Sequence, residues 1–328
     1  MSPDRPLRVA FMASDIIAIP ALEWCHQHPA VNLLAVFAQP DRPTGRGKKL
    51  VANPVKAWAF EKGIEVFQPE KLSAEDQIWV AENDVDITIV MAYGQFLKTK
   101  MLQAPKIDTI NLHGSILPAY RGACPVEASI LNGDAETGVS LMRLVNKMDA
   151  GPVYDVERLP IESGIKGPDL RAAAGEICPT LLERVLPKIV AGELDPIEQN
   201  EAEASYVRRL FKTDARIDFN ESASAIERRS RAFFPWPGCA VGHAGTPLKI
   251  ADLSVAEGNG APGTVVEVDG QIGIACASGI IIPGLWQRPG GKLMPGKDFF
   301  RGYTLEPNTR LESIQNPPVI SSEPYVYA

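Results

Sequence analysis

The stretch LRVAFMASDIIAIPALEWCHQHPAVNLLAVFAQP, from Leu7 to Pro40, indicates the fold class. Its two ends are apolar runs of strand length, and the segment between them, as far as about His28, has helical character. The alternation continues through PVKAWAFEKG, IEVFQP, a helix near Ala74 to Glu82, and VDITIVMAYG. Strands that alternate with helices predict a Rossmann-like α/β fold with a mostly parallel sheet. Sites in such sheets lie beyond the carboxyl ends of the strands.

The sequence pattern changes in the second half of the chain. DLRAAAGEICPTLLERVLPKIVAGEL predicts one long amphipathic helix, and after Pro235 the chain reads as short β segments separated by Gly and Pro. The latter pattern is typical of a small OB-like β-barrel. We therefore expect a first domain over 1–197, a linker over 198–225, the barrel over 226–310 and a loosely held tail over 311–328.

Composition limits the class of protein. The 328 residues include 33 basic and 40 acidic side chains, a net charge of −7, which argues mildly against a nucleic-acid binder unless a local basic patch overrides the average. The five cysteines are scattered without a C-x-x-C pair, so neither disulfides nor a metal site are expected. No signal peptide and no apolar run of about 18 residues occur, which favours a cytoplasmic protein with no membrane partner.

The stretch NLHGSILPAYRG holds the first candidate site residues. Side chains alternate along a strand, so Asn111 and His113 project to one face just before a Gly, Ser and Pro-containing loop. Downstream, Asp149 stands in the turn NKMDAGPV, from which a carboxylate could approach the histidine. Each residue also has a purely structural interpretation, as a satisfied buried histidine and as ordinary turn chemistry.

This Asn, His and Asp set includes no neighbouring nucleophile, because Ser115 lacks a G-x-S-x-G elbow. The set therefore suggests transfer to an external nucleophile, with an amide and an imidazole polarising a carbonyl and managing the proton of an attacking amine. Acyl or formyl transfer to an amine is the reaction class that these residues favour.

The loop QPDRPTGRGKKL is the second candidate. It carries Arg42, Arg46, Lys48 and Lys49 within a Pro- and Gly-rich connection, which suits phosphate groups, although a solvated surface loop has the same composition. Its G-x-G lacks the third glycine of a dinucleotide site, since Leu50 stands there.

Three segments carry a family resemblance: NLHGSILPAYRGACPVEASILNGDAETGVSLMRLVNKMDAGPV, QPDRPTGRGKKL with NPVKAWAFEKGIEVFQP, and RRLFKTDARIDF with RAFFPWPG. Together they closely resemble the methionyl-tRNA formyltransferases, over nearly the whole chain. The first segment is similar to that of all the 10-formyltetrahydrofolate-dependent formyltransferases. The other two are similar to features of the tRNA enzymes.

The resemblance implies roles for individual residues. Asn111 would hold the formyl oxygen, His113 would stabilise the oxyanion and take part in proton transfer, and Asp149 would orient His113 and accept a proton. The implied folate contacts come from Met91, Ala92, Tyr93, Gly94, Gln95, Phe96, Ser115, Ile116, Leu117 and Pro118. The implied contacts to initiator methionyl-tRNA come from Arg42, Arg46, Lys48, Lys49, Arg209, Lys212 and Lys249.

The resemblance further implies a catalytic first domain, a barrel that helps to hold tRNA, a monomer, and a role in translation initiation. The chain departs from the family at the turn Ala13-Ser14-Asp15, where a wider turn is expected. Three rivals stay open: a formyltransferase acting on a sugar amine, a 10-formyltetrahydrofolate hydrolase, and a non-catalytic RNA-binding protein.

Overall fold

The computed structural model describes residues 5–44 and 49–325. The chain divides into two compact units, each with its own sheet. The first unit comprises Met1–Pro125, Glu136–Pro160 and Arg171–Tyr206, and the second comprises Val126–Ala135, Ile161–Leu170 and Val207–Ala328.

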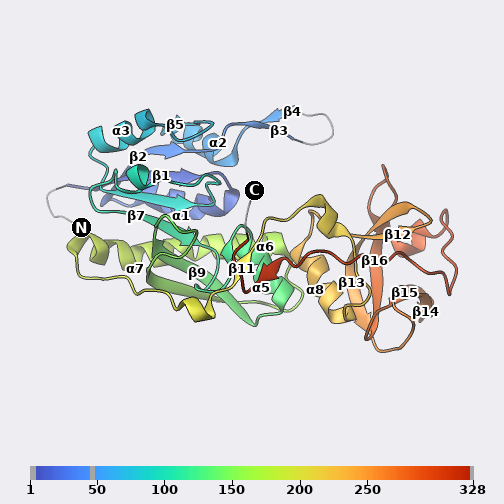
Figure 1. Ribbon diagram of the computed structural model, residues 1–328. Helices are drawn as coiled ribbons and strands as arrows, with labels where there is room; N and C mark the ends of the chain where they lie inside the picture. The colour runs from blue at the N-terminus through green and yellow to red at the C-terminus, as the bar shows by residue number, and fades with distance from the viewer. Residues whose placement is uncertain (1–4, 45–48, 326–328) are drawn as a thin grey trace. The chain divides into compact units, whose positions relative to one another are not determined.

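The first unit is built on a seven-stranded sheet with the order β10-β9-β7-β6-β1-β2-β5 (Figure 1). Its five parallel strands are β1 (Leu7–Ala13), β2 (Val31–Phe37), β5 (Glu65–Phe67), β6 (Ile87–Met91) and β7 (Asp108–His113). At the edge beside β7, β9 (Glu136–Arg143) pairs antiparallel with β7, and β10 (Val153–Pro160) pairs antiparallel with β9. The predicted mostly parallel α/β sheet is confirmed.

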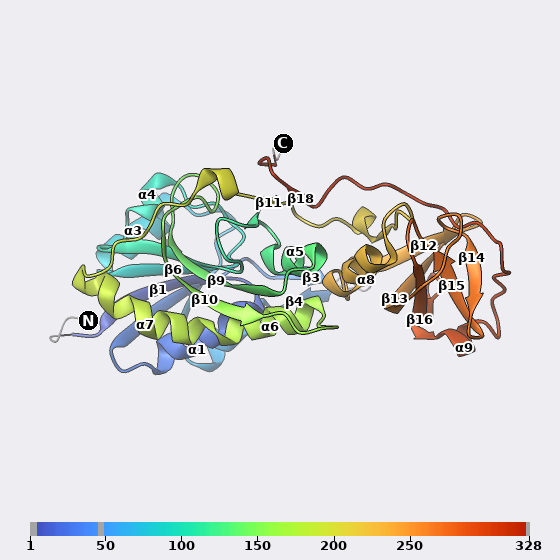
Figure 2. The same cartoon turned by 90° about the horizontal axis from the view of Figure 1, so that it is seen from below.

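Helices cover both faces of this sheet. Figure 2 shows α1 (Ile19–Gln27) and α7 (Cys178–Ala191) side by side along one face, and α3 (Ala74–Glu82) and α4 (Thr99–Leu102) over the other. Alternation along β1 explains the arrangement, because Ala10 and Met12 pack with residues of α3 and α4 while Phe11 between them faces the opposite layer. The predicted helix near Ala74 to Glu82 has those bounds, and a capping box at Ser73 sets its start.

Two predictions for this unit were wrong. The single long helix is two helices, α6 (Gly167–Glu176) and α7, because Pro179 lacks an N–H and its ring would clash with the carbonyl of Gly175 in a continuous helix. The basic connection is also more ordered than a loop, since β3 (Arg42–Thr44) and β4 (Lys49–Val51) pair antiparallel as a hairpin, after which α2 (Pro54–Glu61) begins.

The second unit contains an antiparallel sheet, and its strands have the order β12-β13-β16-β15-β14, with β17 on β16. The strands are β12 (Cys239–His243), β13 (Thr246–Ala256), β14 (Val265–Val268), β15 (Gln271–Ala275), β16 (Ile280–Gln287) and β17 (Met294–Pro295). Main-chain bonds from residues 308–312 reach both edges, at Gly242 and at Val265, so this segment helps to close the sheet into the predicted OB-like form.

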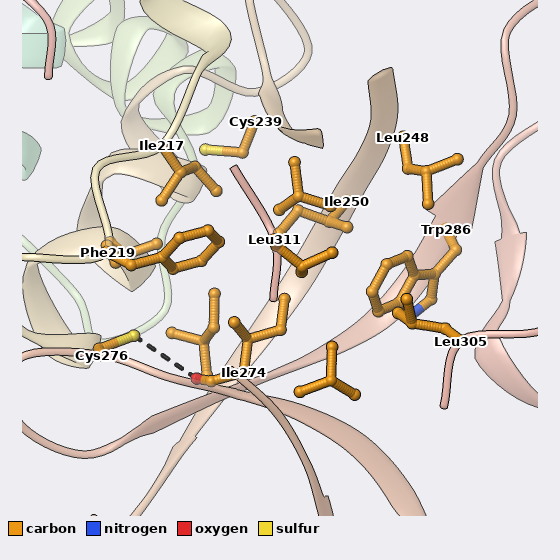
Figure 3. Packing of buried hydrophobic residues seen from close by; sticks show 14 of the residues in the cluster. Ile217, Phe219, Cys239, Leu248, Ile250, Ile274, Cys276, Trp286, Leu305 and Leu311 are labelled. Atoms are coloured by element: carbon orange, nitrogen blue, oxygen red, sulfur yellow. Dashed lines mark hydrogen bonds between the residues drawn. The ribbon is translucent and has the colours of Figure 1, made fainter. Parts of the chain in front are cut away.

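The core of the second unit lies within this curved sheet. Figure 3 shows Ile250 and Leu311 between the rings of Phe219 and Trp286, and Ile274 belongs to the same buried cluster. Trp286 is fully buried, and its indole N–H donates to the Pro283 carbonyl. Helices α8 (Ala223–Ala232) and α9 (Gly296–Phe299) contribute Ile226 and Phe299 to the same cluster.

The short elements of the chain are η1 (Ile16–Ala18), α5 (Pro125–Asn132), β8 (Arg121–Gly122), η2 (Glu201–Glu203), β11 (Tyr206–Val207), η3 (Lys212–Ala215) and β18 (Ile320–Ser321).

The expectation of a loosely held tail does not fit its described part, because Leu311 and Val319 are buried and the Arg208 guanidinium donates to the carbonyls of Pro317 and Pro318. In the part of the chain that the structure describes, no helix has the length and apolarity needed to cross a membrane.

Candidate active site

The first two candidate residues lie at the carboxyl end of β7. This strand runs between β6 and β9, with Asn111 opposite Val90 and Met142 and with His113 opposite Ser140. Both side chains are mostly buried, at 8% and 5% exposure. Because the central sheet fixes the backbone on both sides, the amide and the imidazole are held at defined positions.

Asp149 approaches them from the connection between β9 and β10. Its carboxylate oxygen Oδ2 lies 3.7 Å from Nδ1 of His113. That separation is too long for a direct hydrogen bond but short enough for the carboxylate to stabilise a positive charge on the ring. The structure therefore brings together the Asn, His and Asp that the sequence singled out.

The other ring nitrogen of His113 determines the tautomer. Nε2 lies 3.0 Å from the main-chain oxygen of Tyr120. A carbonyl oxygen can only accept, so Nε2 carries a hydrogen. In the neutral ring Nδ1 is then a free base directed toward Asp149, in the position to receive a proton.

The Asn111 amide is available to a substrate. Among residues 5–44 and 49–325, none forms a hydrogen bond with its side chain. An amide N–H beside the imidazole is a suitable donor to a carbonyl oxygen on which negative charge develops. Over the same described ranges, no group of three or more His, Cys, Asp or Glu side chains could hold a metal ion.

Hydrogen bonds from two other residues and one close backbone approach restrain the turn that carries Asp149. The Gly122 N–H donates to the Asp149 carboxylate at 2.8 Å, and the Gln199 amide donates to the main-chain oxygens of Asp149 and Gly151 at 2.8 and 2.7 Å. Asp149 adopts the left-handed φ of +47°. A Cβ at Gly151 would lie 1.9 Å from the carbonyl oxygen of Arg143, so only glycine fits this close approach.

The loop after β7 is also held firmly. The Ser140 hydroxyl donates to the Ser115 carbonyl at 2.7 Å and accepts the Leu117 N–H at 3.0 Å. The Ser115 hydroxyl donates to the Ala119 carbonyl. Ser115 and Leu117 are buried, whereas Ile116 and Pro118 are half-buried and can offer surface to a ligand.

The segment after β6 divides in the same way. Met91 and Tyr93 are buried in the core, and the Gln95 amide bonds with the main chain of Leu72 and Pro69. The exposed members are Ala92, Gly94 and Phe96. Any folate contact from this segment would therefore use the Phe96 ring and the backbone at Ala92 and Gly94.

The altered turn after β1 supports this segment. The main-chain N–H of Ser14 donates to the Ala92 carbonyl, and its hydroxyl donates to the Tyr93 carbonyl and accepts the N–H of Gln39. Asp15 caps η1 and pairs with Arg171 at 2.9 Å. Ser14 thus ties together the carboxyl ends of β1, β2 and β6.

The predicted basic residues fall into three groups. Arg42 is exposed in the hairpin of the first unit and pairs with Glu70 at 2.6 Å. Arg46 and Lys48 lie outside the described residues, as does the side chain of Lys49, whose backbone pairs with Thr44. The predicted cations of the second unit, Arg209, Lys212 and Lys249, are all exposed.

Arg208, the residue before Arg209, is not exposed to solvent. Its guanidinium is buried, with both terminal nitrogens 2.8 Å from the Asp214 carboxylate. Sequence reasoning missed Gln199 and Arg121. Arg121 stands in the quoted NLHGSILPAYRG stretch, but no local pattern indicates that its side chain reaches Gln199.

Comparisons with known proteins identify the family of both parts of the chain. Residues 8–182 match the family described as Formyl transferase, and residues 209–304 match Formyl transferase, C-terminal domain. The solved structure of an N-formyltransferase from Helicobacter canadensis, in complex with folinic acid and dTDP-3-aminofucose, covers 85% of this chain and 98% of its own, with a TM-score of 0.61 and 21% identity. At that identity the similarity shows a shared fold.

Two curated relatives are similar over nearly the full length. The methionyl-tRNA formyltransferase of Acidiphilium cryptum is 39% identical over 307 residues, which are 93% of this chain and 100% of that protein. The methionyl-tRNA formyltransferase of Thermus thermophilus is 38% identical over 314 residues, 94% of this chain and 100% of that protein. This chain therefore belongs to the methionyl-tRNA formyltransferase family.

Proposed function

We propose that the protein transfers the formyl group of 10-formyltetrahydrofolate to the amino group of methionine on initiator methionyl-tRNA. The observation that carries the proposal is the approach of Asp149 to Asn111 and His113 at the end of β7, in a chain with methionyl-tRNA formyltransferase relatives over 93% and 94% of its length. The acceptor is an aminoacylated tRNA, so the proposed setting is translation initiation in the cytoplasm.

The reaction joins the methionyl nitrogen to the formyl carbon and breaks the bond from that carbon to N10 of the folate. As the amine attacks, the formyl oxygen gains negative charge, which the Asn111 amide N–H stabilises. The amine must lose one proton, and Nδ1 of His113 is the free base that receives it. Asp149, 3.7 Å away, stabilises the resulting imidazolium.

The collapse of the tetrahedral intermediate returns the proton. N10 leaves as an amine and takes one proton, so the His113–Asp149 pair ends in its starting state. The reaction needs no covalent enzyme intermediate and no redox partner. The proposed donor site lies along the exposed atoms at Ala92, Gly94 and Phe96, with the Ile116 to Pro118 loop beside the catalytic cluster.

The proposed tRNA contacts come from basic residues of both units. Arg42 and Lys49 belong to the two strands of the hairpin, and the cations Arg209, Lys212 and Lys249 belong to the second unit. Their charges would neutralise phosphates despite the net charge of −7 of the whole chain.

The test uses purified protein, 10-formyltetrahydrofolate and charged initiator tRNA, and measures formyl-methionyl-tRNA together with released tetrahydrofolate. We expect equal amounts of both products. His113→Ala should abolish turnover and leave tRNA binding unchanged, whereas His26→Ala, at an exposed histidine of α1, should retain activity. Release of tetrahydrofolate and formate without labelled tRNA would assign the protein as a hydrolase, and equal turnover by His113→Ala would overturn the proposed role of the ring.

A further inference from the structure

Gln199 lies outside the cluster just described, in a polar segment between the two domains expected from sequence. Its side-chain Nε2 donates to the main-chain oxygens of Asp149 and Gly151, at 2.8 and 2.7 Å. One amide group therefore uses both of its hydrogens on the same turn. The turn is the one that carries the carboxylate facing His113.

The orientation of this amide is imposed by Arg121. The Arg121 guanidinium donates to the Gln199 oxygen from Nε at 3.0 Å and from Nη2 at 2.9 Å, and its side chain is fully buried. Because the oxygen of Gln199 is occupied by two donors, its nitrogen must face the Asp149 turn. Nη2 also donates to Glu201 at 2.8 Å, and hydrogen bonds from Arg121 and Lys147 lower the pKa of Glu201 to about 2, which keeps that partner ionised.

The neighbours of Arg121 contact the same catalytic pair. The Tyr120 carbonyl accepts from Nε2 of His113, and the Gly122 N–H donates to the Asp149 carboxylate at 2.8 Å. Three consecutive residues thus set the position of both His113 and Asp149, and Gln199 connects the middle one to the backbone of the turn. A change in this frame would alter the 3.7 Å separation between Nδ1 and the carboxylate.

We propose that Gln199 is a positioning residue that, oriented by Arg121, holds the Asp149 carboxylate at its working distance from His113. The inference rests on the proposed function, because it assigns Gln199 a part in formyl transfer. Gln199 touches neither donor nor acceptor, and it acts through the turn alone. Its removal therefore changes the rate of the chemical step and leaves substrate affinity unchanged.

The substitution Gln199→Glu keeps the contact with Arg121 and removes the contact with the Asp149 turn. A glutamate oxygen still accepts from Arg121, whereas the other oxygen cannot donate to the carbonyls of Asp149 and Gly151. We expect kcat to fall by roughly ten- to hundredfold, which is the scale for a displacement of about 1 Å at a catalytic group, with KM for both substrates unchanged. Gln103→Glu, an equal charge change at an exposed residue after α4, is the control and should keep full activity.

A double-mutant cycle tests whether the effect passes through Asp149. In an Asp149→Asn background, where the carboxylate is already lost, Gln199→Glu should lower kcat by less than about twofold. Multiplicative losses in the double variant would overturn the inference, as would a rise in KM with kcat unchanged. If Gln199→Glu does not fold, Gln199→Met replaces it in the kinetic assay and in the double-mutant cycle, because the methionine side chain has a similar length and no hydrogen-bond donor.

Amide hydrogen exchange provides a readout that needs no enzymatic activity. The Gly122 N–H is bonded to the Asp149 carboxylate, and the adjacent Arg121 N–H is bonded to the Ser205 carbonyl. We expect Gln199→Glu to accelerate exchange at Gly122 by about tenfold or more and to leave Arg121 protected. Unchanged exchange at Gly122 would overturn the inference, even if the wild-type protein proved inactive toward methionyl-tRNA and the proposed function itself failed.

Discussion

Gly151→Ala is the sharpest perturbation of the turn that does not touch a reacting group. An added Cβ would lie 1.9 Å from the carbonyl oxygen of Arg143, and real Cβ contacts essentially never fall below 3.0 Å, so the atoms must separate by at least 3.0 − 1.9 = 1.1 Å. The obstacle is main chain of β9, which cannot rotate away as a side chain can. The turn from Asp149 to Gly151 must therefore move instead.

The size of that movement determines the expected effect. A shift of about 1 Å at a catalytic group corresponds to roughly a hundredfold loss of rate, so kcat for formyl transfer should fall by about that factor. Overpacking of this kind costs about 1–3 kcal/mol of stability. It also weakens the bond from the Arg143 N–H to the Pro152 carbonyl, which is 2.9 Å long and lies beside the added atom.

The assay is steady-state formylation of methionyl-tRNA at saturating folate, with urea denaturation of the same samples. Gly175→Ala is the matched control, because its Cβ would lie 2.7 Å from the Ile17 carbonyl and so destabilises by backbone collision at a site without contact to Asp149. We expect both variants to lose stability and only Gly151→Ala to lose kcat. Full kcat in a folded Gly151→Ala protein would refute the argument that the turn must stay in place.

Two further predictions concern charged pairs. Burial, the largest single influence, raises the pKa of Asp214, but the hydrogen bonds from Arg208 and from the Phe211 N–H outweigh it and leave the pKa below its usual value. The pair therefore stabilises the fold fully above about pH 4, the pKa of an aspartate in the unfolded chain, and this contribution is lost as the pH falls through the lower pKa of the folded state. Asp214→Asn should lower the free energy of unfolding by about 3 kcal/mol at pH 7, measured by urea denaturation. The stability of the variant should also fall less steeply than that of the wild type as the pH is lowered. Arg42→Ala should raise KM for tRNA, and the increase should be smaller at high salt. Glu70→Gln should lower KM for tRNA, because the exposed Arg42–Glu70 pair, worth about 1 kcal/mol or less, competes with phosphate for Arg42. Unchanged KM in both variants would remove Arg42 from the proposed tRNA interface.

Local patterns in the sequence predict most of the first sheet and its helices. Alternation of apolar strands and helices depends on neighbours a few residues apart, which is why α3 is found with its bounds and β1, β6 and β7 in their places. The prediction of a single helix was wrong although the sequence contains Pro179, because the amphipathic spacing on both sides of this proline suggested one continuous helix. The β3–β4 hairpin lacks an apolar alternation and reads as a connection.

The candidate site was predictable only where its residues share an element. Asn111 and His113 lie two positions apart on one strand, so the periodicity of a strand is enough to place them together. The approach of Asp149 depends on the antiparallel return of β9, which sequence patterns do not fix. The contact between Arg121 and Gln199 joins residues 78 positions apart and leaves no local signal at either of them.

This difference has a physical origin in how each candidate residue is held. A side chain on a central strand is positioned by main-chain hydrogen bonds on both sides, as β7 is by β6 and β9, and needs no dedicated partner. A side chain on a turn lacks that ladder and must be restrained by groups from elsewhere, here the Gln199 side chain and the Gly122 main-chain N–H. A formyltransferase of this kind can therefore keep its Asn, His and Asp and still lose its rate, if the turn that carries the aspartate is no longer held.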